Sequence, residues 1–144
     1  MKQVYIINEN HPQLLLFFAG WAADETPFKQ YRPKDMDYMI CYDYRTLDFD
    51  YSIFDRYRQV NVVAWSMGVC MGSLILSQVP RDKVFSLAFN GTTYPIDNLE
   101  GIPVKTFQAT LDGLTPATLQ KFLRRMCKDS NAYKAFMEVT PRRD

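Results

Sequence analysis

The stretch Val62-Val63-Ala64-Trp65-Ser66-Met67-Gly68-Val69-Cys70-Met71-Gly72 places a serine between an apolar strand and a helix that begins with small residues. It follows the G-x-S-x-G pattern of a nucleophile elbow, with Ala64 in the first small position. Small residues at 64 and 68 let strand and helix approach closely, so the turn raises the Ser66 hydroxyl above the carboxyl edge of a sheet and aims the helix amides at it. Ser66 is therefore a candidate nucleophile. The plainer alternative is a strand-to-helix turn in which Ser66 only caps the helix.

Apolar runs on either side of this stretch alternate with helical segments. Strands are predicted at Val4–Ile7, Leu14–Phe18, Tyr38–Tyr42, Gln59–Ala64, Lys83–Phe89 and Val104–Ala109. Helices are predicted at Phe49–Tyr57, Met67–Gln78, from Thr115-Pro116 onward and at Asn131–Met137, with one helical turn in Ala22–Tyr31. Turn residues at 8–12 predict a hairpin between the first two strands. The alternation predicts an α/β fold, with a mostly parallel sheet and helices on both faces.

The composition narrows the classes of protein. The chain has 144 residues, enough for one domain with a continuous core, and 47% of them are apolar. Seventeen Lys and Arg stand against 16 Asp and Glu, so no overall field favours nucleic acid. Three scattered cysteines without a CxxC pair argue against a disulfide framework or a zinc site, and no metal or organic cofactor is implied. The longest apolar run is too short to cross a bilayer and no signal peptide is evident, so we expect a cytoplasmic protein that does not bind membranes.

A second chemical signal follows the apolar strand that ends at Phe18. An acyl-transfer site needs an amide donor opposite the one that follows the nucleophile, and a glycine-containing loop after an early strand supplies it in α/β-hydrolases. The Trp21 N–H is the candidate donor, with Gly20 allowing close approach, and the Met67 N–H is its partner. The alternative is a simple turn with a core tryptophan.

The base and the acid that such a serine needs are missing from their usual places. The expected order is Ser, then Asp or Glu, then His, and no histidine follows Ser66. Asp97 and Asp112 are candidate acids, although turn or cap carboxylates are the more ordinary interpretation of both. His11 precedes the second predicted strand, so we expect it at the sheet edge opposite Ser66, out of reach as a base.

Motifs along the whole chain resemble the BioG family of α/β-hydrolases. The matching segments are Leu16-Phe17-Phe18-Ala19-Gly20-Trp21, Val63-Ala64-Trp65-Ser66-Met67-Gly68, Phe89-Asn90-Gly91-Thr92-Thr93-Tyr94-Pro95-Ile96-Asp97, Gly101-Ile102-Pro103, Thr110-Leu111 and Phe122-Leu123-Arg124-Arg125-Met126-Cys127. The resemblance implies a pimeloyl-[acyl-carrier-protein] methyl ester esterase of biotin synthesis. It also implies Ser66 as nucleophile, with the Trp21 and Met67 amides as the oxyanion hole.

The substrate implied by the resemblance is acidic and carries an apolar acyl chain. From Lys121 to the end of the chain, seven basic residues stand against three acidic ones. The partner-binding candidates are Lys121, Arg124, Arg125 and Lys128, which can dock an acidic acyl-carrier protein. A solvated helix face is the alternative. Trp65 and Phe122 are candidate pocket residues for the acyl chain.

The resemblance also implies a missing part, because the family continues past the position of Asp144 and supplies its catalytic Asp and His there. We therefore expect a chain truncated at the C-terminus, with an α/β-hydrolase core over 1–112 and the start of a helical cap over 113–144. The complete protein would be a serine carboxylesterase, and the 144-residue chain would be nearly inactive. The alternatives are a non-catalytic remnant that only binds an acyl-carrier or another partner, and a hydrolase of the same fold for another ester or thioester.

Overall fold

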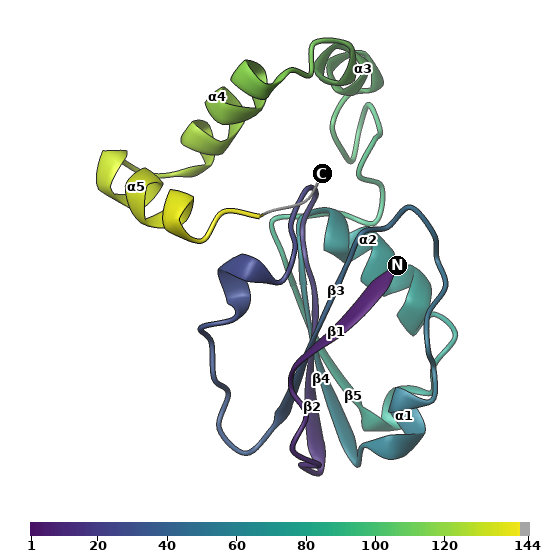
Figure 1. The fold of residues 1–144 in the computed structure, drawn as a ribbon. Coiled ribbons are helices and arrows are strands. Elements are labelled where there is room, and N and C mark those ends of the chain that lie inside the picture. The colour runs from purple at the N-terminus through teal and green to yellow at the C-terminus, as the bar shows by residue number, and fades with distance from the viewer. Residues whose placement is uncertain (142–144) are drawn as a thin grey trace. The chain divides into compact units, whose positions relative to one another are not determined.

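Residues Met1–Pro95 of the computed structural model are built on a five-stranded sheet (Figure 1). The structure describes residues 1–141, apart from the side chain of Arg81. The strands are β1 (Lys2–Ile7), β2 (Gln13–Phe18), β3 (Asp37–Tyr42), β4 (Gln59–Trp65) and β5 (Val84–Phe89). Their order across the sheet is β1-β3-β2-β4-β5; β1 is antiparallel to β3, and the other neighbouring strands are parallel. The predicted α/β fold with a mostly parallel sheet is confirmed.

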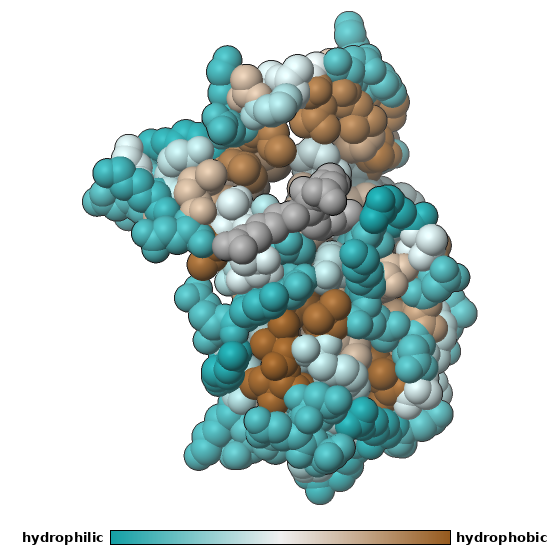
Figure 2. Space-filling model, viewed as in Figure 1, coloured by the Kyte–Doolittle hydropathy of each residue, from teal (hydrophilic) through white to brown (hydrophobic). Residues whose placement is uncertain are grey.

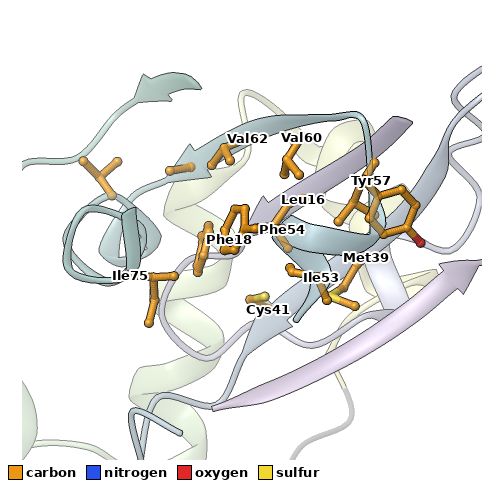
Figure 3. Close-up of a cluster of buried hydrophobic side chains, with 13 residues drawn as sticks. Leu16, Phe18, Met39, Cys41, Ile53, Phe54, Tyr57, Val60, Val62 and Ile75 are labelled. Carbon is orange, nitrogen blue, oxygen red and sulfur yellow. The ribbon is translucent and has the colours of Figure 1, made fainter. Parts of the chain in front are cut away.

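One face of this sheet packs against α1 (Ile53–Arg56) and α2 (Met67–Leu76), and η2 (Arg81–Lys83) then leads into β5. Alternate residues of a strand point to one face, so Leu16 and Phe18 of β2 enter the same cluster. Figure 3 shows their side chains converging with those of Ile53 and Ile75 from the two helices. Burial of these apolar side chains holds α2, and therefore the turn before it, against the sheet.

The opposite face is covered by the segment between β2 and β3, which contains the short 3-10 helix η1 (Thr26–Phe28). Phe17 of β2 meets Phe28 edge to face, with ring centroids 4.8 Å apart, and Ile40 of β3 is buried beside them. Both α-helices of this unit lie on the same face of the sheet (Figure 1), and both contribute to the first cluster. Within the described part of the unit, the expectation of helices on both faces therefore holds for one face, and η1 covers the other.

The predicted hairpin between the first two strands is wrong. β1, which precedes the turn at Asn8–Pro12, pairs with β3, whereas β2 lies between β3 and β4 in parallel register. The physical reason is burial: β2 is apolar on both faces and needs neighbours on both sides, while β1 begins with Lys2 and Gln3 and suits an edge.

Residues Ile96–Thr140 form a second unit made of α3 (Val104–Asp112), α4 (Pro116–Met126) and α5 (Ser130–Glu138). The predicted strand at Val104–Ala109 is wrong, because these residues belong to α3, in which Val104, Phe107 and Leu111 recur at helical spacing. The helix predicted from Thr115 is confirmed, with Thr115 and Thr118 forming a capping box. Apolar side chains lie at the surface of α3 and α4 (Figure 2), and no residue of the three helices is buried.

The division into a core over 1–112 and a cap from 113 concerns the roles of these segments and stays a prediction.

No helix among the described residues has the length and apolar character needed to cross a membrane.

Candidate functional site

Ser66 occupies the turn between the carboxyl end of β4 and the first residue of α2. Its backbone has φ 57° and ψ −126°, a conformation that a residue with a side chain rarely adopts. Its N–H donates to the Phe89 carbonyl at 3.2 Å, and its own carbonyl accepts from the Val69 N–H at 3.0 Å. Its hydroxyl makes no capping bond to α2. The alternative in which Ser66 serves only as a helix cap therefore lacks the hydrogen bond that defines it.

Two glycines let the backbone pack tightly around Ser66. A Cβ at Gly68 would lie 2.2 Å from the Phe18 carbonyl oxygen of β2. A Cβ at Gly91, after β5, would lie 2.2 Å from the Ser66 carbonyl oxygen. Neither space admits a side chain, so the two glycines set how closely α2 and the end of β5 approach the turn.

The loop after β2 lies against the same turn, as predicted. A Cβ at Gly20 would be 3.2 Å from the Cβ of Ser66 and 3.0 Å from the ring of Trp65. The preceding residue, Ala19, donates from its N–H to the Cys41 carbonyl at 2.9 Å and accepts from the Tyr44 hydroxyl at 2.7 Å. These bonds tie the start of the loop to β3, so Gly20 is held beside Ser66 by the sheet itself.

The predicted donors of an oxyanion hole are the N–H groups of the residues that follow Ser66 and Gly20 in the sequence. Met67 is the first residue of α2, where helix geometry leaves an N–H without an intrahelical acceptor. Trp21 follows Gly20 directly and precedes Ala22, which has a positive φ of 59°. Gly20, Trp65, Ser66 and Met67 are thus brought together, whereas their chemical roles, with that of Trp21, stay predictions.

The candidate acids make local hydrogen bonds in the second unit. Asp97 accepts from the N–H groups of Leu99 at 2.8 Å and Glu100 at 2.9 Å, and these bonds hold its pKa below the usual value. Asp112 accepts from the Gln108 side chain at 2.8 Å, one turn away on α3. The ordinary interpretation as a turn carboxylate agrees with the contacts of Asp97, whereas the bond of Asp112 joins two side chains of α3.

His11 lies at the sheet edge opposite Ser66. It precedes β2, whose first residue pairs with the first residue of β4, whereas Ser66 follows the last residue of β4. Strands of this length separate the two edges by about 15–20 Å. The His11 ring nitrogen Nδ1 instead lies 3.0 Å from Oδ1 of Asp37. Because His11 is the chain's single histidine, this sequence contains no histidine base for Ser66.

Sequence reasoning missed the polar network that holds His11. Asp37 is fully buried and accepts from the Glu9 N–H at 2.9 Å, the His11 N–H at 3.3 Å and the Tyr57 hydroxyl at 2.7 Å. Burial works to raise the pKa of the Asp37 carboxyl, but these hydrogen bonds outweigh it and hold the pKa below its usual value. Burial, with the bonds to Tyr5 and Asp37, raises the pKa of Tyr57. The available signal was a carboxylate at the start of a continuously apolar strand, which requires nearby donors.

Three of the predicted partner-binding residues share a groove in the second unit. A groove of about 460 Å³ is lined by Ala117, Gln120, Lys121, Arg124, Arg125 and Tyr133. The Arg124 guanidinium lies 5.7 Å from the Tyr133 ring centre and donates to Ser130 Oγ at 3.2 Å, which fixes its position. Lys128 follows α4 and is not among the lining residues, and Phe122 belongs to the same helix. A pocket built from Trp65 and Phe122 stays a prediction.

The fold and site together define an α/β protein with a strand–serine–helix turn at the carboxyl edge of a parallel sheet. The family model described as "Pimeloyl-ACP methyl esterase BioG" matches residues 1–143. The chain therefore belongs to the BioG family.

The similar proteins include longer chains. The crystal structure of selenomethionine BioG from Haemophilus influenzae superimposes with a TM-score of 0.88 and 34% identity, over 99% of this chain and 65% of that one. A Bacteroides fragilis protein named malonyl-[acyl-carrier protein] O-methyltransferase is 50% identical over 131 residues, which are 91% of this chain and 27% of that protein. An uncharacterized Haemophilus influenzae protein is 37% identical over 85% of this chain and 56% of its own length. This chain thus spans about a quarter and about half of these two relatives.

The comparison corrects the expected activity. The prediction of a serine carboxylesterase, with its description as a hydrolase, is contradicted by the name of the Bacteroides relative, which is that of a methyltransferase. That name and the family description have the acyl-carrier protein in common, and they name different reactions. The coarser part of the prediction, membership of a family linked to acyl-carrier protein, stands.

Proposed function

We propose that this chain binds an acyl group carried on an acyl-carrier protein, with the ester end of the acyl group at the Ser66 turn. The family description and the Bacteroides relative's name both specify an acyl group on a carrier protein and chemistry at its O-methyl group. The ligand that unites the family description with this site is a pimeloyl methyl ester on the carrier. The sheet of residues 1–95 is, in this proposal, the serine-bearing part of a hydrolase-like fold that the longer relatives continue.

The observation that carries the proposal is the strained backbone of Ser66. A positive φ at a serine costs free energy and persists only where the surrounding structure holds it, and here the turn is closely packed at Gly68 and Gly91. The strain places a hydroxyl and the amino end of α2 at one point beside Gly20. A carbonyl oxygen at that point would meet N–H donors from α2 and from the loop after β2.

Binding, as distinct from turnover, suits the residues that this chain has. A serine needs a base within hydrogen-bond reach to act efficiently, and the single histidine is engaged with Asp37 at the far edge of the sheet. The chain can still orient a carbonyl through its amides, because that interaction requires no proton transfer.

The carrier itself is proposed to dock on the groove of α4 and α5. Acyl-carrier proteins are acidic, and Lys121, Arg124 and Arg125 present three positive charges along this groove. Charge complementarity of this kind mainly raises the association rate. This increase becomes smaller as salt is added, because exposed charges are screened within about 8–10 Å.

Calorimetric titration tests the proposal. The chain is titrated with carrier protein bearing the pimeloyl methyl ester through a stable amide arm, and with the unloaded carrier. We expect the loaded carrier to bind at least tenfold more tightly, and Trp65→Ala, beside Gly20, to reduce that preference. Reversing the charge of Arg124 and Arg125 should weaken the binding of both carriers, and the loss of affinity should grow as salt is lowered. Lys134→Glu on α5, outside the groove, should leave both affinities unchanged.

Two results would contradict the proposal. Equal affinity for loaded and unloaded carrier would show that the acyl group is not bound at the Ser66 turn. An equal loss of carrier affinity in Lys134→Glu and in the charge reversal of the groove would show that the groove is an ordinary solvated surface and not a docking site.

A further inference from the structure

A cavity of the first unit, here called the α1 cavity, is lined by β1, β3 and the segment that forms α1. Its volume is about 410 Å³, near the lower end of the range for small-molecule sites. The Ser66 turn is built from other elements, namely β2, β4, β5 and α2. The α1 cavity is therefore a separate place in the fold. Its lining residues are Gln3, Tyr5, Met39, Asp50, Ser52, Ile53 and Arg56.

The floor of the α1 cavity is apolar. Met39 is 2% exposed and Ile53 is 4% exposed, and both belong to the buried cluster against α1 and α2. Figure 3 shows these two side chains next to each other. Tyr5 pairs with Met39 across the two strands and packs against the same cluster. A ligand with an apolar body would gain free energy by covering this floor.

Arg56 supplies a positive charge that neutral groups hold in place. Its guanidinium carbon lies 5.6 Å from the ring centre of Tyr5 and 5.3 Å from that of Tyr57. Its Nη2 donates to Oδ1 of Asn8 at 2.8 Å and of Asn10 at 2.9 Å. Within residues 1–141, Nε and Nη1 have no acceptor and no carboxylate pairs with Arg56. The guanidinium therefore keeps donors for an anionic group.

Asp50 supplies a negative charge on a segment that is tied to β1. Its N–H donates to Oε1 of Gln3 at 2.7 Å, and its carbonyl accepts from Nε2 of Gln3 at 3.5 Å. Hydrogen bonds from the side chain and the backbone of Ser52 hold the pKa of Asp50 below its usual value, so the carboxylate is charged at neutral pH. Among the described residues no cation pairs with Asp50. Two opposite charges thus line one cavity without an ion pair between them.

We propose that the α1 cavity binds a small apolar amino acid, with its carboxylate at Arg56, its ammonium at Asp50 and its side chain against Met39 and Ile53. A zwitterion satisfies both charges at once. A simple anion would be repelled by Asp50, and a simple cation would be repelled by Arg56. The inference does not depend on what the Ser66 turn binds, because the two sites share no residue.

Titration of the chain with L-leucine, followed by NMR of methyl-labelled methionine, tests the site. The Met39 methyl signal, assigned by its loss in Met39→Leu, should shift and saturate, because Met39 forms the floor. The signal of Met137, on α5, is the internal control and should not move. We expect a dissociation constant of about 1 mM or lower. No shift of the Met39 signal at roughly ten times that concentration would overturn the proposal.

Two analogues of leucine test the zwitterion. The acid 4-methylpentanoate lacks the ammonium group, and 3-methylbutylamine lacks the carboxylate, while both keep the apolar body. Each should bind at least tenfold more weakly than leucine, because each leaves one charge of the cavity unpaired and faces a like charge. Equal affinity of leucine and either analogue would overturn the assignment.

Matched variants place the two charges of the ligand. Asp50→Asn keeps an oxygen acceptor for the Ser52 N–H, and it should weaken leucine at least tenfold without weakening 4-methylpentanoate. Asp48→Asn, at an exposed carboxylate outside the cavity, should leave both affinities unchanged. Arg56→Gln should weaken leucine and 4-methylpentanoate together, whereas Arg58→Gln, also exposed and outside the cavity, should weaken neither. An equal loss of leucine affinity in Asp50→Asn and Asp48→Asn would show that binding follows overall charge, and would overturn the proposal even if Arg56→Gln failed to fold.

Discussion

Residues 1–95 and residues 96–140 are held together by different interactions. In the first unit, side chains far apart in sequence are buried together, such as Leu16 of β2 with Ile53 of α1 and Ile75 of α2. In the second unit, no described residue is buried, and the helices begin at local caps such as Thr115 and Asp129. The first unit therefore owes its structure to long-range apolar burial, and the second to hydrogen bonds within a few residues.

The difference teaches where a site with fixed geometry can be built. The Ser66 turn is fixed by contacts with β2, β5 and α2, all in the buried unit. The basic groove lies on α4 and α5, in which no residue is buried and whose first turns are capped by Thr115 and Asp129. Both tryptophans, Trp21 and Trp65, lie in the first unit, so their fluorescence reports on it, while far-ultraviolet circular dichroism also includes the helices of the second.

The largest loss of stability is expected for a substitution at Gly68. In Gly68→Ala the new Cβ would lie 2.2 Å from the Phe18 carbonyl oxygen and 2.7 Å from that of Ala19, and both are backbone atoms, at the last residue of β2 and the residue after it. Relief requires α2 to move away from β2, at a cost of about 3 kcal/mol or more. Urea unfolding followed by tryptophan fluorescence should show a much lower midpoint.

Gly113→Ala is the matched control in the second unit. Its Cβ would lie 3.2 Å from the Ala109 carbonyl oxygen, and its φ of −92° suits alanine, so we expect a change within about 0.5 kcal/mol. Equal unfolding midpoints for the two variants would contradict the tight turn at Ser66.

A smaller and pH-dependent loss of stability is expected for a substitution at Asp37. Asp37→Asn replaces a buried acceptor of four hydrogen bonds, and losing part of that set should cost about 1–3 kcal/mol at pH 7. The folded pKa of Asp37 lies below the unfolded value of about 3.9, so its stabilisation is complete above that value and is lost as pH falls through the folded pKa. Urea unfolding at a series of pH values should show the difference between wild type and variant shrinking below about pH 4.

Asp112→Asn tests whether this effect belongs to the buried network. Asp112 is exposed and accepts one bond, from Gln108, so its replacement should change the unfolding free energy by less than about 0.5 kcal/mol at any pH. A gap between wild type and Asp37→Asn that stays constant down to pH 2 would contradict the lowered pKa.

The sequence was sufficient to predict the strands and helices of the first unit and the strand–Ser66–helix turn. Continuous apolar strands and small residues at 64 and 68 are strong local signals, and the α/β fold with a mostly parallel sheet that they predict was confirmed. Strand pairing was harder, because the turn residues at 8–12 are compatible with a hairpin and with a crossover to β3. Only burial of β2 on both faces decides between them.

Two other failures have a physical cause in context. Val104–Ala109 has too few apolar residues to separate a strand from a helix by period, and Pro103 before it permits either. The Asp37 network joins residues 9, 11, 37 and 57, which no local pattern relates to one another. The reaction was mispredicted for another reason: a serine turn specifies a geometry, and the same geometry is compatible with several chemistries.

The smallest loss of stability is expected in the second unit, for a substitution at the cap of α4. The Thr115 side chain accepts from the Thr118 N–H at 3.2 Å, and the Thr118 hydroxyl accepts from the Thr115 N–H at 2.7 Å. Thr115→Ala breaks this capping box and should cost about 1 kcal/mol of helix stability. Because no side chain of α4 is buried, little else compensates, and the loss should appear as lower helicity at 222 nm while tryptophan fluorescence stays unchanged. Thr110→Ala on α3 is the control, since the Thr110 hydroxyl only bonds back to the Thr106 carbonyl within the helix, and its removal should be neutral or slightly favourable. A parallel loss of fluorescence in Thr115→Ala would show that the first unit depends on the cap of α4 and would break the distinction between the two units.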